Sequence, residues 1–185
     1  MINAQLIIGY FIKFSFSRHA IMTTMFWLLI VVTLLLIGFA GGGLLGAPWV
    51  PTRKIDVETV LEAASLQPNQ LFIELGCGDG RLVVAAAKRG AKAIGYEINP
   101  LLWLVATLRT LRYYPRARIR LANFWSISLA DADVVMAFLM PKFIPRLAAK
   151  TAHELKPGSR LISYIFKVNG RKPVKSSDHW FIYKY

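Results

Sequence analysis

Hydrophobic positions along this chain form one long uninterrupted run, followed by many short ones. The long run lies in a stretch without formal charge, residues 20–52, and is almost wholly apolar over residues 25–46. At about 1.5 Å per residue, a helix of that length reaches roughly 33 Å, which is enough to cross a hydrocarbon core of about 30 Å. The pattern therefore predicts a transmembrane helix over residues 25–46, preceded by an N-terminal extension of residues 1–24.

Beyond this run, short apolar segments alternate with amphipathic stretches, as is typical of a parallel sheet with crossover helices. Strands are expected at Leu71 to Leu75, Ala91 to Tyr96, Ile119 to Leu121, Ala132 to Phe138, Arg160 to Phe166, Pro173 to Lys175 and Trp180 to Tyr183. Helices are expected at Asp56 to Ser65, Arg81 to Arg89, Pro100 to Tyr113 and Lys142 to Leu155. The last two strands are close enough to form a hairpin. The chain thus predicts one α/β domain over residues 47–185.

The distribution of charged residues predicts where the domain is located. Lys13 and Arg18 are the only two of the 23 basic residues before the apolar run, so the part from Arg53 onward carries 21 basic and all 10 acidic residues. A domain this basic is expected to lie against anionic headgroups, and the positive-inside tendency places it on the cytoplasmic side, or the matrix side in a mitochondrion. The expected localisation is therefore that of a single-pass membrane protein with the lipid bilayer as a partner.

Other interpretations follow from the same features. A cleaved signal peptide is an alternative to the anchor, although the apolar run is longer than the usual hydrophobic region of such peptides. Cys77 is the only cysteine, so the chain can form no internal disulfide, which fits a reducing compartment. The histidines are scattered without metal-ligand spacing, so no metal site is predicted. Nucleic acid is a weaker expectation, because basic charge favours it and an anchor does not.

The residues that carry chemistry begin where the first predicted strand breaks into the segment Glu74 to Arg81, which contains three alternating glycines, Gly76, Gly78 and Gly80. Glycine permits backbone conformations closed to other residues, and it lets a ligand approach without a Cβ in the way. The amide groups at the start of the next helix can then bind a carboxylate or phosphate. This turn is therefore predicted to bind a ligand, with Glu97 at the end of the second strand holding ribose hydroxyls.

The spacing of the glycines narrows the choice of ligand. A dinucleotide fold requires Gly-x-Gly-x-x-Gly, whereas here the third glycine comes one residue early and Arg81 stands in its place. An acidic residue such as Glu74 on the preceding strand is also foreign to that pattern. NAD is therefore the weaker alternative.

The segments Glu-Leu-Gly-Cys-Gly-Asp-Gly-Arg (Glu74 to Arg81) and Gly-Tyr-Glu-Ile-Asn-Pro (Gly95 to Pro100) resemble the Rossmann-like, seven-strand class I methyltransferases, which use S-adenosylmethionine. Within that class, the apolar run and the Pro-Trp-Val-Pro-Thr segment (Pro48 to Thr52) resemble the membrane-anchored protein-lysine methyltransferases. The members in question act on the ATP synthase c subunit and the adenine nucleotide translocase, and they have prokaryotic relatives.

This resemblance implies roles for individual residues around S-adenosylmethionine. The methionine end would be surrounded by Glu74, Gly76, Gly78 and Asp79, and Cys77 and Gly80 of the same turn are also expected to bind the cofactor. Glu97 would hold the ribose, and Ile98 would cover one face of the adenine. Asn123 stands where the class often has an aspartate that binds the adenine amino group, with Phe124 beside it. That departure weakens the assignment of Asn123, although an amide oxygen can accept the same hydrogen bond.

The methyl acceptor is expected beyond the fourth strand, at Phe138-Leu139-Met140-Pro141. Methylases of adenine and of glutamine amides carry Asn/Asp-Pro-Pro-Tyr/Phe there, so a nucleobase amine is a poor candidate. Pro51, Thr52, Met140 and Pro141 are the candidates for the substrate channel, with loop packing as their alternative role. No general base is identified, because methyl transfer to a lysine amine depends mainly on positioning a neutral nucleophile.

The apolar run itself contains Gly38, Gly42 and Gly46 at every fourth residue, a spacing that forms a groove for helix–helix association. The combined expectation is an S-adenosylmethionine-dependent protein-lysine methyltransferase acting on a membrane protein. Methylation of a lipid or quinone and a non-catalytic, cofactor-binding partner of a membrane complex are the alternatives.

Overall fold

A computed structural model describes residues 18–33 and 50–185. The chain divides into two compact units, Met1–Phe39 and Ala40–Tyr185, and each is considered by itself. In the first unit, residues 18–33 are helical. The second unit contains the α/β domain.

The structure corrects the predicted localisation. None of the helices within residues 18–33 and 50–185 is both long enough and apolar enough to span a bilayer. This finding contradicts the prediction of a single-pass membrane protein with its domain on the cytoplasmic or matrix side. Residues 34–46 of the predicted membrane helix, with Gly38, Gly42 and Gly46, lie outside the described residues.

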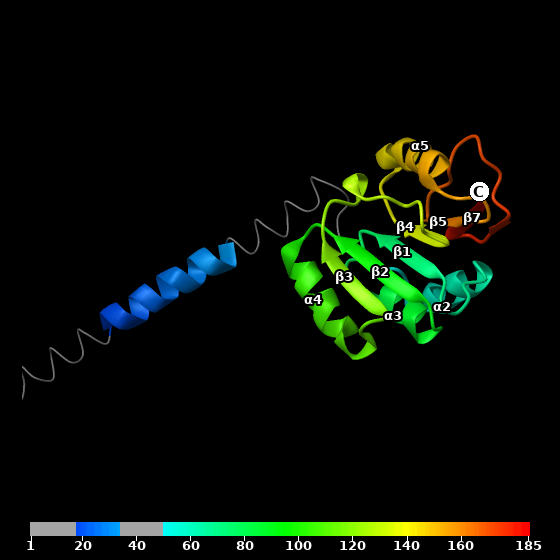
Figure 1. Ribbon diagram of the computed structural model, residues 1–185. Helices are drawn as coiled ribbons and strands as arrows, with labels where there is room; N and C mark the ends of the chain where they lie inside the picture. The colour runs from blue at the N-terminus through cyan, green and yellow to red at the C-terminus, as the bar shows by residue number, and fades with distance from the viewer. Residues whose placement is uncertain (1–17, 34–49) are drawn as a thin grey trace, which may run out of the picture. The chain divides into compact units, whose positions relative to one another are not determined.

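The second unit is built around a seven-stranded sheet of order β3-β2-β1-β4-β5-β7-β6 (Figure 1). Its strands are β1 (Leu71–Leu75), β2 (Lys92–Glu97), β3 (Ala117–Leu121), β4 (Val134–Ala137), β5 (Arg160–Tyr164), β6 (Lys175–Ser176) and β7 (Trp180–Lys184). The first five strands are parallel, and β7 pairs antiparallel with both β5 and β6. All seven predicted strands are present, and so is the predicted C-terminal hairpin.

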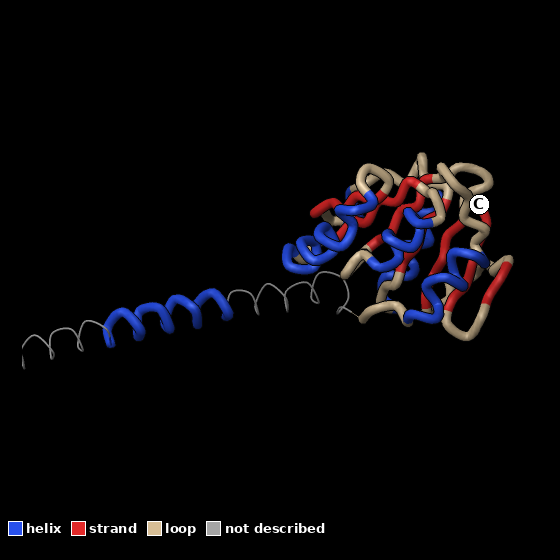
Figure 2. Tube along the Cα trace, turned by 90° about the horizontal axis from the view of Figure 1, so that it is seen from below, coloured by secondary structure: helices blue, strands red, loops and turns tan. Residues whose placement is uncertain are grey.

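Four α-helices and three short 3₁₀ helices accompany the sheet. They are α2 (Lys54–Ala63), α3 (Arg81–Lys88), α4 (Pro100–Thr110), α5 (Ile144–Glu154), η1 (Leu111–Tyr113), η2 (Phe124–Ser126) and η3 (Pro141–Phe143). Figures 1 and 2 show α2, α3 and α4 on one face of the sheet and α5 on the other. Crossover helices on both faces are what a buried parallel sheet requires.

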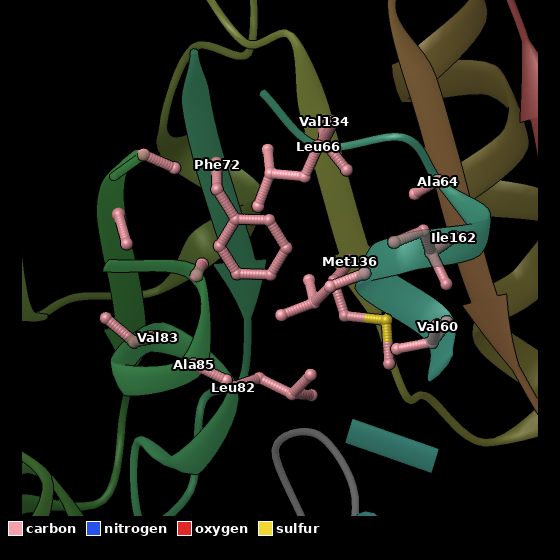
Figure 3. Packing of buried hydrophobic residues seen from close by; sticks show 14 of the residues in the cluster. Val60, Ala64, Leu66, Phe72, Leu82, Val83, Ala85, Val134, Met136 and Ile162 are labelled. Carbon is pink, nitrogen blue, oxygen red and sulfur yellow. The ribbon is translucent and has the colours of Figure 1, made fainter. Parts of the chain in front are cut away.

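The core follows this layering, because successive residues of a strand point to opposite faces. Along β4, Val134 and Met136 belong to the hydrophobic cluster beneath α2 and α3, while Val135 and Ala137 belong to the cluster beneath α5. Figure 3 shows the first cluster, in which Phe72, Met136 and Ile162 of the sheet are packed with residues of α2 and α3.

Two predicted elements end earlier than expected, for local reasons. The helix predicted over 100–113 changes to 3₁₀ geometry after Thr110. The strand predicted over 160–166 ends at Tyr164, since Ile165 has a φ of +68° and cannot continue an extended strand. The helix predicted over 142–155 begins as η3 and becomes α-helical only at Ile144. The types of these elements were thus predicted correctly and their boundaries were not, whereas the predicted bounds of β1 match those observed.

Candidate functional site

The sheet order has a topological switch point at its centre. Strands β2 and β3 follow β1 on one side, whereas β4 and β5 lie on the other, so the chain reverses direction across the sheet between β1 and β4. Leu75, the last residue of β1, is paired with Ala137, the last residue of β4. Ligands of open α/β sheets bind at this switch point, outside the carboxyl ends of the strands. The glycine turn follows β1 and therefore lies at this edge.

The turn has a backbone that only glycine adopts readily. Gly76, Gly78 and Gly80 have φ values of +77°, +53° and +73°. The amides of Gly76 and Cys77 both donate to the carbonyl of Tyr96 on β2, each at 2.9 Å. The turn is thus fixed against the neighbouring strand by its own backbone. This conformation confirms the predicted need for glycine there.

Two of these glycines differ in what surrounds them. A Cβ added at Gly76 would meet no atom closer than Phe124 Cε1, 3.9 Å away, so its side faces open space. A Cβ at Gly80 would lie 3.1 Å from Ala106 Cβ on α4. Gly76 therefore leaves room for a ligand beside Phe124, whereas Gly80 permits α3 and α4 to pack closely.

Cys77 contributes to the turn through its backbone. Its side chain is buried and packs over Gly95, where a Cβ would approach Cys77 Sγ to 2.7 Å. Burial, together with the charges of Glu74 and Glu97, raises the pKa of the Cys77 thiol well above its usual value. The thiol therefore belongs to the hydrophobic core and does not act as an exposed nucleophile beside the turn.

Glu97 is held at the end of β2 by three backbone amides. Its Oε2 accepts from the Gly78 amide at 2.8 Å, and its Oε1 accepts from the amides of Ile98 at 2.9 Å and Asn99 at 2.8 Å. The side chain is buried. A carboxylate offers about four lone-pair positions, so three amides fix its orientation and leave acceptor capacity on Oε2. The predicted acidic partner of the turn is thus brought into contact with it.

Glu74 lies on β1, directly before the turn, and is buried with no hydrogen-bond partner for Oε2. Burial raises the pKa of Glu74 well above its usual value, and the charges of Asp79 and Glu97 raise it further. An unpartnered buried carboxyl oxygen is costly unless a ligand satisfies it. Glu74, Asp79 and Glu97 therefore gather at this turn, and the free oxygen of Glu74 favours a ligand that donates hydrogen bonds.

Asp79 is bound by two arginines that the sequence did not single out as site residues. Its Oδ2 lies 2.7 Å from Arg81 Nη2 and 2.7 Å from Arg109 Nη1 on α4. Burial alone would raise the pKa of Asp79, but the hydrogen bonds from Arg81 and the two positive charges hold it below its usual value. Arg81 also donates to the carbonyl of Thr52 at 2.9 Å. Asp79 therefore fixes the turn to α4 and, through Arg81, to the segment that precedes α2.

The remaining predicted cofactor residues lie around the same edge. Ile98 follows Glu97 and is partly buried, and Phe124 is buried in η2. Asn123 caps η2, because its Oδ1 accepts from the Trp125 amide at 3.0 Å. One acceptor position of this amide is thus already used, and a second lone pair stays available.

The four candidate channel residues are only partly brought together. Thr52 is buried, and its bond from Arg81 places it beside the turn, with Pro51 next to it in sequence. Met140 and Pro141 follow β4, whose carboxyl end lies at the same edge of the sheet. Of the two arginines that bind Asp79, Arg81 could have been identified from the sequence, because it directly follows the third glycine. Arg109 could not, since Asp79 lies 30 residues away from it in the sequence.

Comparison with known proteins identifies what this arrangement is similar to. The sequence profile of a family described as the ANTKMT methyltransferase domain matches residues 74–175. A protein-lysine N-methyltransferase of Saccharolobus islandicus is 36% identical over 130 residues, which are 68% of this chain and 81% of the relative. The Rattus norvegicus lysine N-methyltransferase of the ATP synthase c subunit is 35% identical over 121 residues, which are 64% of this chain and 56% of the relative. The chain thus spans little more than half of the rat protein.

A solved structure gives the same result for the fold. An RNA methyltransferase from Salinibacter ruber, in complex with S-adenosyl-L-homocysteine, superposes with a TM-score of 0.70 at 27% identity. The match covers 73% of this chain and 93% of that one. The resemblance to class I methyltransferases is therefore confirmed for the sheet and its helices. Membrane anchoring is not part of what these comparisons show.

Proposed function

We propose that this chain, which belongs to the family described as the ANTKMT methyltransferase domain, methylates the side-chain amine of lysine in a protein. Membership of that family makes it an S-adenosylmethionine-dependent methyltransferase with a class I fold. Its lysine-directed relatives support the choice of acceptor. The single observation that carries the site assignment is the glycine turn closed against Glu97, with Glu74 behind it.

The residues at the turn fit S-adenosylmethionine. When bound, this cofactor supplies a methyl group on a positively charged sulfur. Glu97 has acceptor capacity left for ribose hydroxyls, and Gly76 leaves space beside its backbone. The unpartnered oxygen of Glu74 would accept from the ammonium group of the methionine end. An ammonium group can donate to the free oxygen of Glu74, whereas a pyrophosphate has no donor for it.

The other residues of the proposed site have supporting roles. Gly78 and Gly80 shape the turn, and Cys77 contributes its backbone. Asp79 is engaged by two arginines, so its role is to hold the turn and not to contact the methionine end directly. We assign the adenine to the space bounded by Ile98 and Phe124. Asn123 would accept from the adenine amino group with its second lone pair.

Lysine is the preferred acceptor because the residues after β4, Phe138-Leu139-Met140-Pro141, lack the Asn/Asp-Pro-Pro-Tyr/Phe motif of nucleobase methylases. Pro51, Thr52, Met140 and Pro141 would line the approach to the cofactor. The name of the rat relative points to a lysine of a membrane protein. Association with the bilayer, predicted from residues 25–46 and the basic charge of the domain, stays a prediction. So does association with a partner helix, which was predicted from Gly38, Gly42 and Gly46, outside the described part of the chain.

RNA is a second candidate acceptor, favoured by the similarity to the Salinibacter ruber enzyme and by the basic charge of the domain. A lipid or quinone acceptor is a third. One experiment separates all three. The full chain is incubated with methyl-labelled S-adenosylmethionine and an extract of its source cells, which is then divided into protein, RNA and lipid fractions. A Glu97→Gln variant serves as the inactive control.

We expect label in protein, on lysine, with a mass increase of about 14 Da for each methyl group. Label in RNA or in lipid, absent from the Glu97→Gln control, would contradict the lysine assignment and leave the cofactor assignment intact. Label in no fraction, with cofactor binding intact, would contradict the acceptor assignment altogether.

A further inference from the structure

The acceptor side of the site is bounded by the short segment from Thr52 to Asp56. At one end of this segment, the Thr52 carbonyl accepts from Arg81, which follows the glycine turn after β1. At the other end, Arg53 Nη1 lies 2.9 Å from His179 Nε2, directly before β7. His179 stands at the carboxyl end of β5, since its carbonyl accepts from the Ile165 amide at 2.7 Å. These contacts tie Thr52 and Arg53 to residues that follow β1 and β5, the two strands that flank β4 in the sheet.

Asp56, the last residue of this segment, brings a buried carboxylate into contact with a buried phenol. The Tyr164 hydroxyl, at the end of β5, donates to Asp56 Oδ2 at 2.5 Å. The Phe138 ring, from the residue directly after β4, packs edge-on against Tyr164 with ring centroids 4.9 Å apart. A carboxylate and two aromatic rings thus stand together where β4 and β5 end. This is where the acceptor is expected to meet the cofactor.

Asp56 has acceptor capacity beyond its two side-chain contacts. Its ion pair with Arg53 is loose, at 3.9 Å from Arg53 Nε, and that arginine side chain is 57% exposed. Asp79, by contrast, has two guanidinium groups at 2.7 Å. Both contacts of Asp56 are made by Oδ2, and Oδ1 takes part in neither. An ionised carboxylate can accept further donors on that oxygen.

Tyr164 is suited to hold this carboxylate in place and not to accept a proton from a substrate. Burial raises the pKa of Tyr164 to about 12, and the hydrogen bond to Asp56 adds to the effect. The phenol therefore stays protonated at physiological pH and donates to Asp56. A fixed carboxylate beside a partly exposed aromatic ring is a favourable site for an alkylammonium group, which pairs with the charge and can pack its methylenes on the Phe138 ring.

We propose that Asp56, held by Tyr164 and flanked by Phe138, forms the subsite that binds the acceptor's ammonium group beside the cofactor. This inference rests on the proposed lysine specificity and deepens it. It assigns a binding role to Asp56 and a positioning role to Tyr164. It also gives a reason for a buried acidic residue at this edge of a basic domain, since RNA would not require one there.

The test uses butylammonium, a mimic of the lysine side chain, with the full chain saturated by S-adenosylhomocysteine. Binding is measured by NMR titration for the wild type and for Asp56→Asn, Tyr164→Phe and Glu62→Gln. Glu62 is an exposed carboxylate on the same helix and serves as the matched control. The neutral probe 1-butanol controls for apolar contact alone. S-adenosylhomocysteine affinity is measured for every variant as a readout of fold and of the cofactor site.

We expect Asp56→Asn to weaken butylammonium binding at least about fivefold, and Tyr164→Phe about two- to fivefold, as for loss of a charged or charge-assisted contact. Glu62→Gln should change it less than about twofold, and S-adenosylhomocysteine and 1-butanol affinities should be unchanged in all variants. Equal butylammonium affinity in the wild type and Asp56→Asn would overturn the inference alone. If Asp56→Asn fails to fold, unchanged butylammonium affinity in Tyr164→Phe would overturn it. No binding of S-adenosylhomocysteine to the wild type would overturn the proposed function together with the inference.

Discussion

At the scale of single residues, the site consists of carboxyl groups in different electrostatic environments. Glu97 is satisfied by backbone amides, Asp79 by arginines, and one oxygen of Glu74 by nothing in the described protein. Burying an ionisable group without a partner destabilises the folded chain. Glu74 therefore lowers the free energy of unfolding of the ligand-free protein, and a cationic ligand that pairs with it can offset this loss. Stability and cofactor binding should therefore respond to Glu74 in opposite directions.

Replacing Glu74 by Gln is expected to stabilise the ligand-free protein and to weaken its binding of S-adenosylmethionine. Because the folded-state pKa of Glu74 is raised, its favourable contribution is present at low pH and is lost as pH rises toward that value. The variant should therefore gain about 1–2 kcal/mol, or roughly 2–6 °C in melting temperature, near pH 8, and less near pH 5. Thermal unfolding at both pH values measures this. An equal gain at both would contradict the electrostatic explanation.

Arg81 is expected to position the turn. Arg81→Lys removes the planar guanidinium that contacts both Asp79 oxygens and the Thr52 carbonyl together, which a single ammonium group cannot do. We predict that calorimetric titration will show affinity for S-adenosylhomocysteine weakened about tenfold.

Arg89→Lys is the matched control for this variant. Arg89 directly follows the last residue of α3, the helix that Arg81 begins, and it pairs with Glu58 of α2, away from the turn. Its replacement should change the affinity less than about twofold. Similar effects in the two variants would show that Arg81 acts through general stability and not through the turn.

At the scale of elements, two glycines of the turn between β1 and α3 have different roles. Gly76 and Gly80 both have positive φ, so alanine at either position costs roughly 1–2 kcal/mol of backbone strain. Gly80→Ala adds a close contact with Ala106 on α4, while Gly76→Ala does not. We therefore expect Gly80→Ala to lower the melting temperature more than Gly76→Ala.

Binding should follow a different order from stability. The Cβ of Gly76→Ala would project into the space beside Phe124, where the cofactor is placed, so this variant should be folded and should lose most of its affinity for S-adenosylhomocysteine. Melting curves and calorimetric titrations of both variants provide the comparison. A folded Gly76→Ala variant with the affinity of the wild type would show that the turn does not contact the ligand.

Much of the element pattern could be predicted from sequence, because alternation and glycine punctuation are local. The strand before Gly76, the turn and the pairing of Glu97 with it all follow from short-range signals. The Arg109–Asp79 and Asp56–Tyr164 contacts could not be predicted, since they join residues 30 and 108 positions apart. The early end of β5 was also missed, because nothing in its sequence distinguishes Ile165 from a strand residue.

At the scale of the whole molecule, the sequence predicted the α/β class correctly and the localisation incorrectly. The localisation was predicted from hydropathy over residues 25–46, and residues 34–46 of that run lie outside the described part of the chain. The described helical residues 18–33 begin before the run and include polar Thr23 and Thr24, whose hydroxyls donate to backbone carbonyls of the same helix.

Ligand binding should stabilise the molecule as a whole, because it acts only on the folded state. At a concentration about 100 times the dissociation constant, S-adenosylhomocysteine should contribute about 2.7 kcal/mol and raise the melting temperature by roughly 5–10 °C. Thermal unfolding with and without the ligand measures this shift, with NADH at the same concentration as the control. A comparable shift of the melting temperature with NADH would contradict the assignment of S-adenosylmethionine to the glycine turn.

The most direct test of the account is calorimetric titration of the full chain with S-adenosylmethionine, beside a Glu97→Gln variant and an NADH control. We predict one binding site in the wild type, affinity at least about tenfold weaker in the variant because the amide loses charge toward the ribose hydroxyls, and no heat from NADH. Binding of NADH, or equal affinity for S-adenosylmethionine in a folded Glu97→Gln variant, would contradict the placement of the cofactor at this turn.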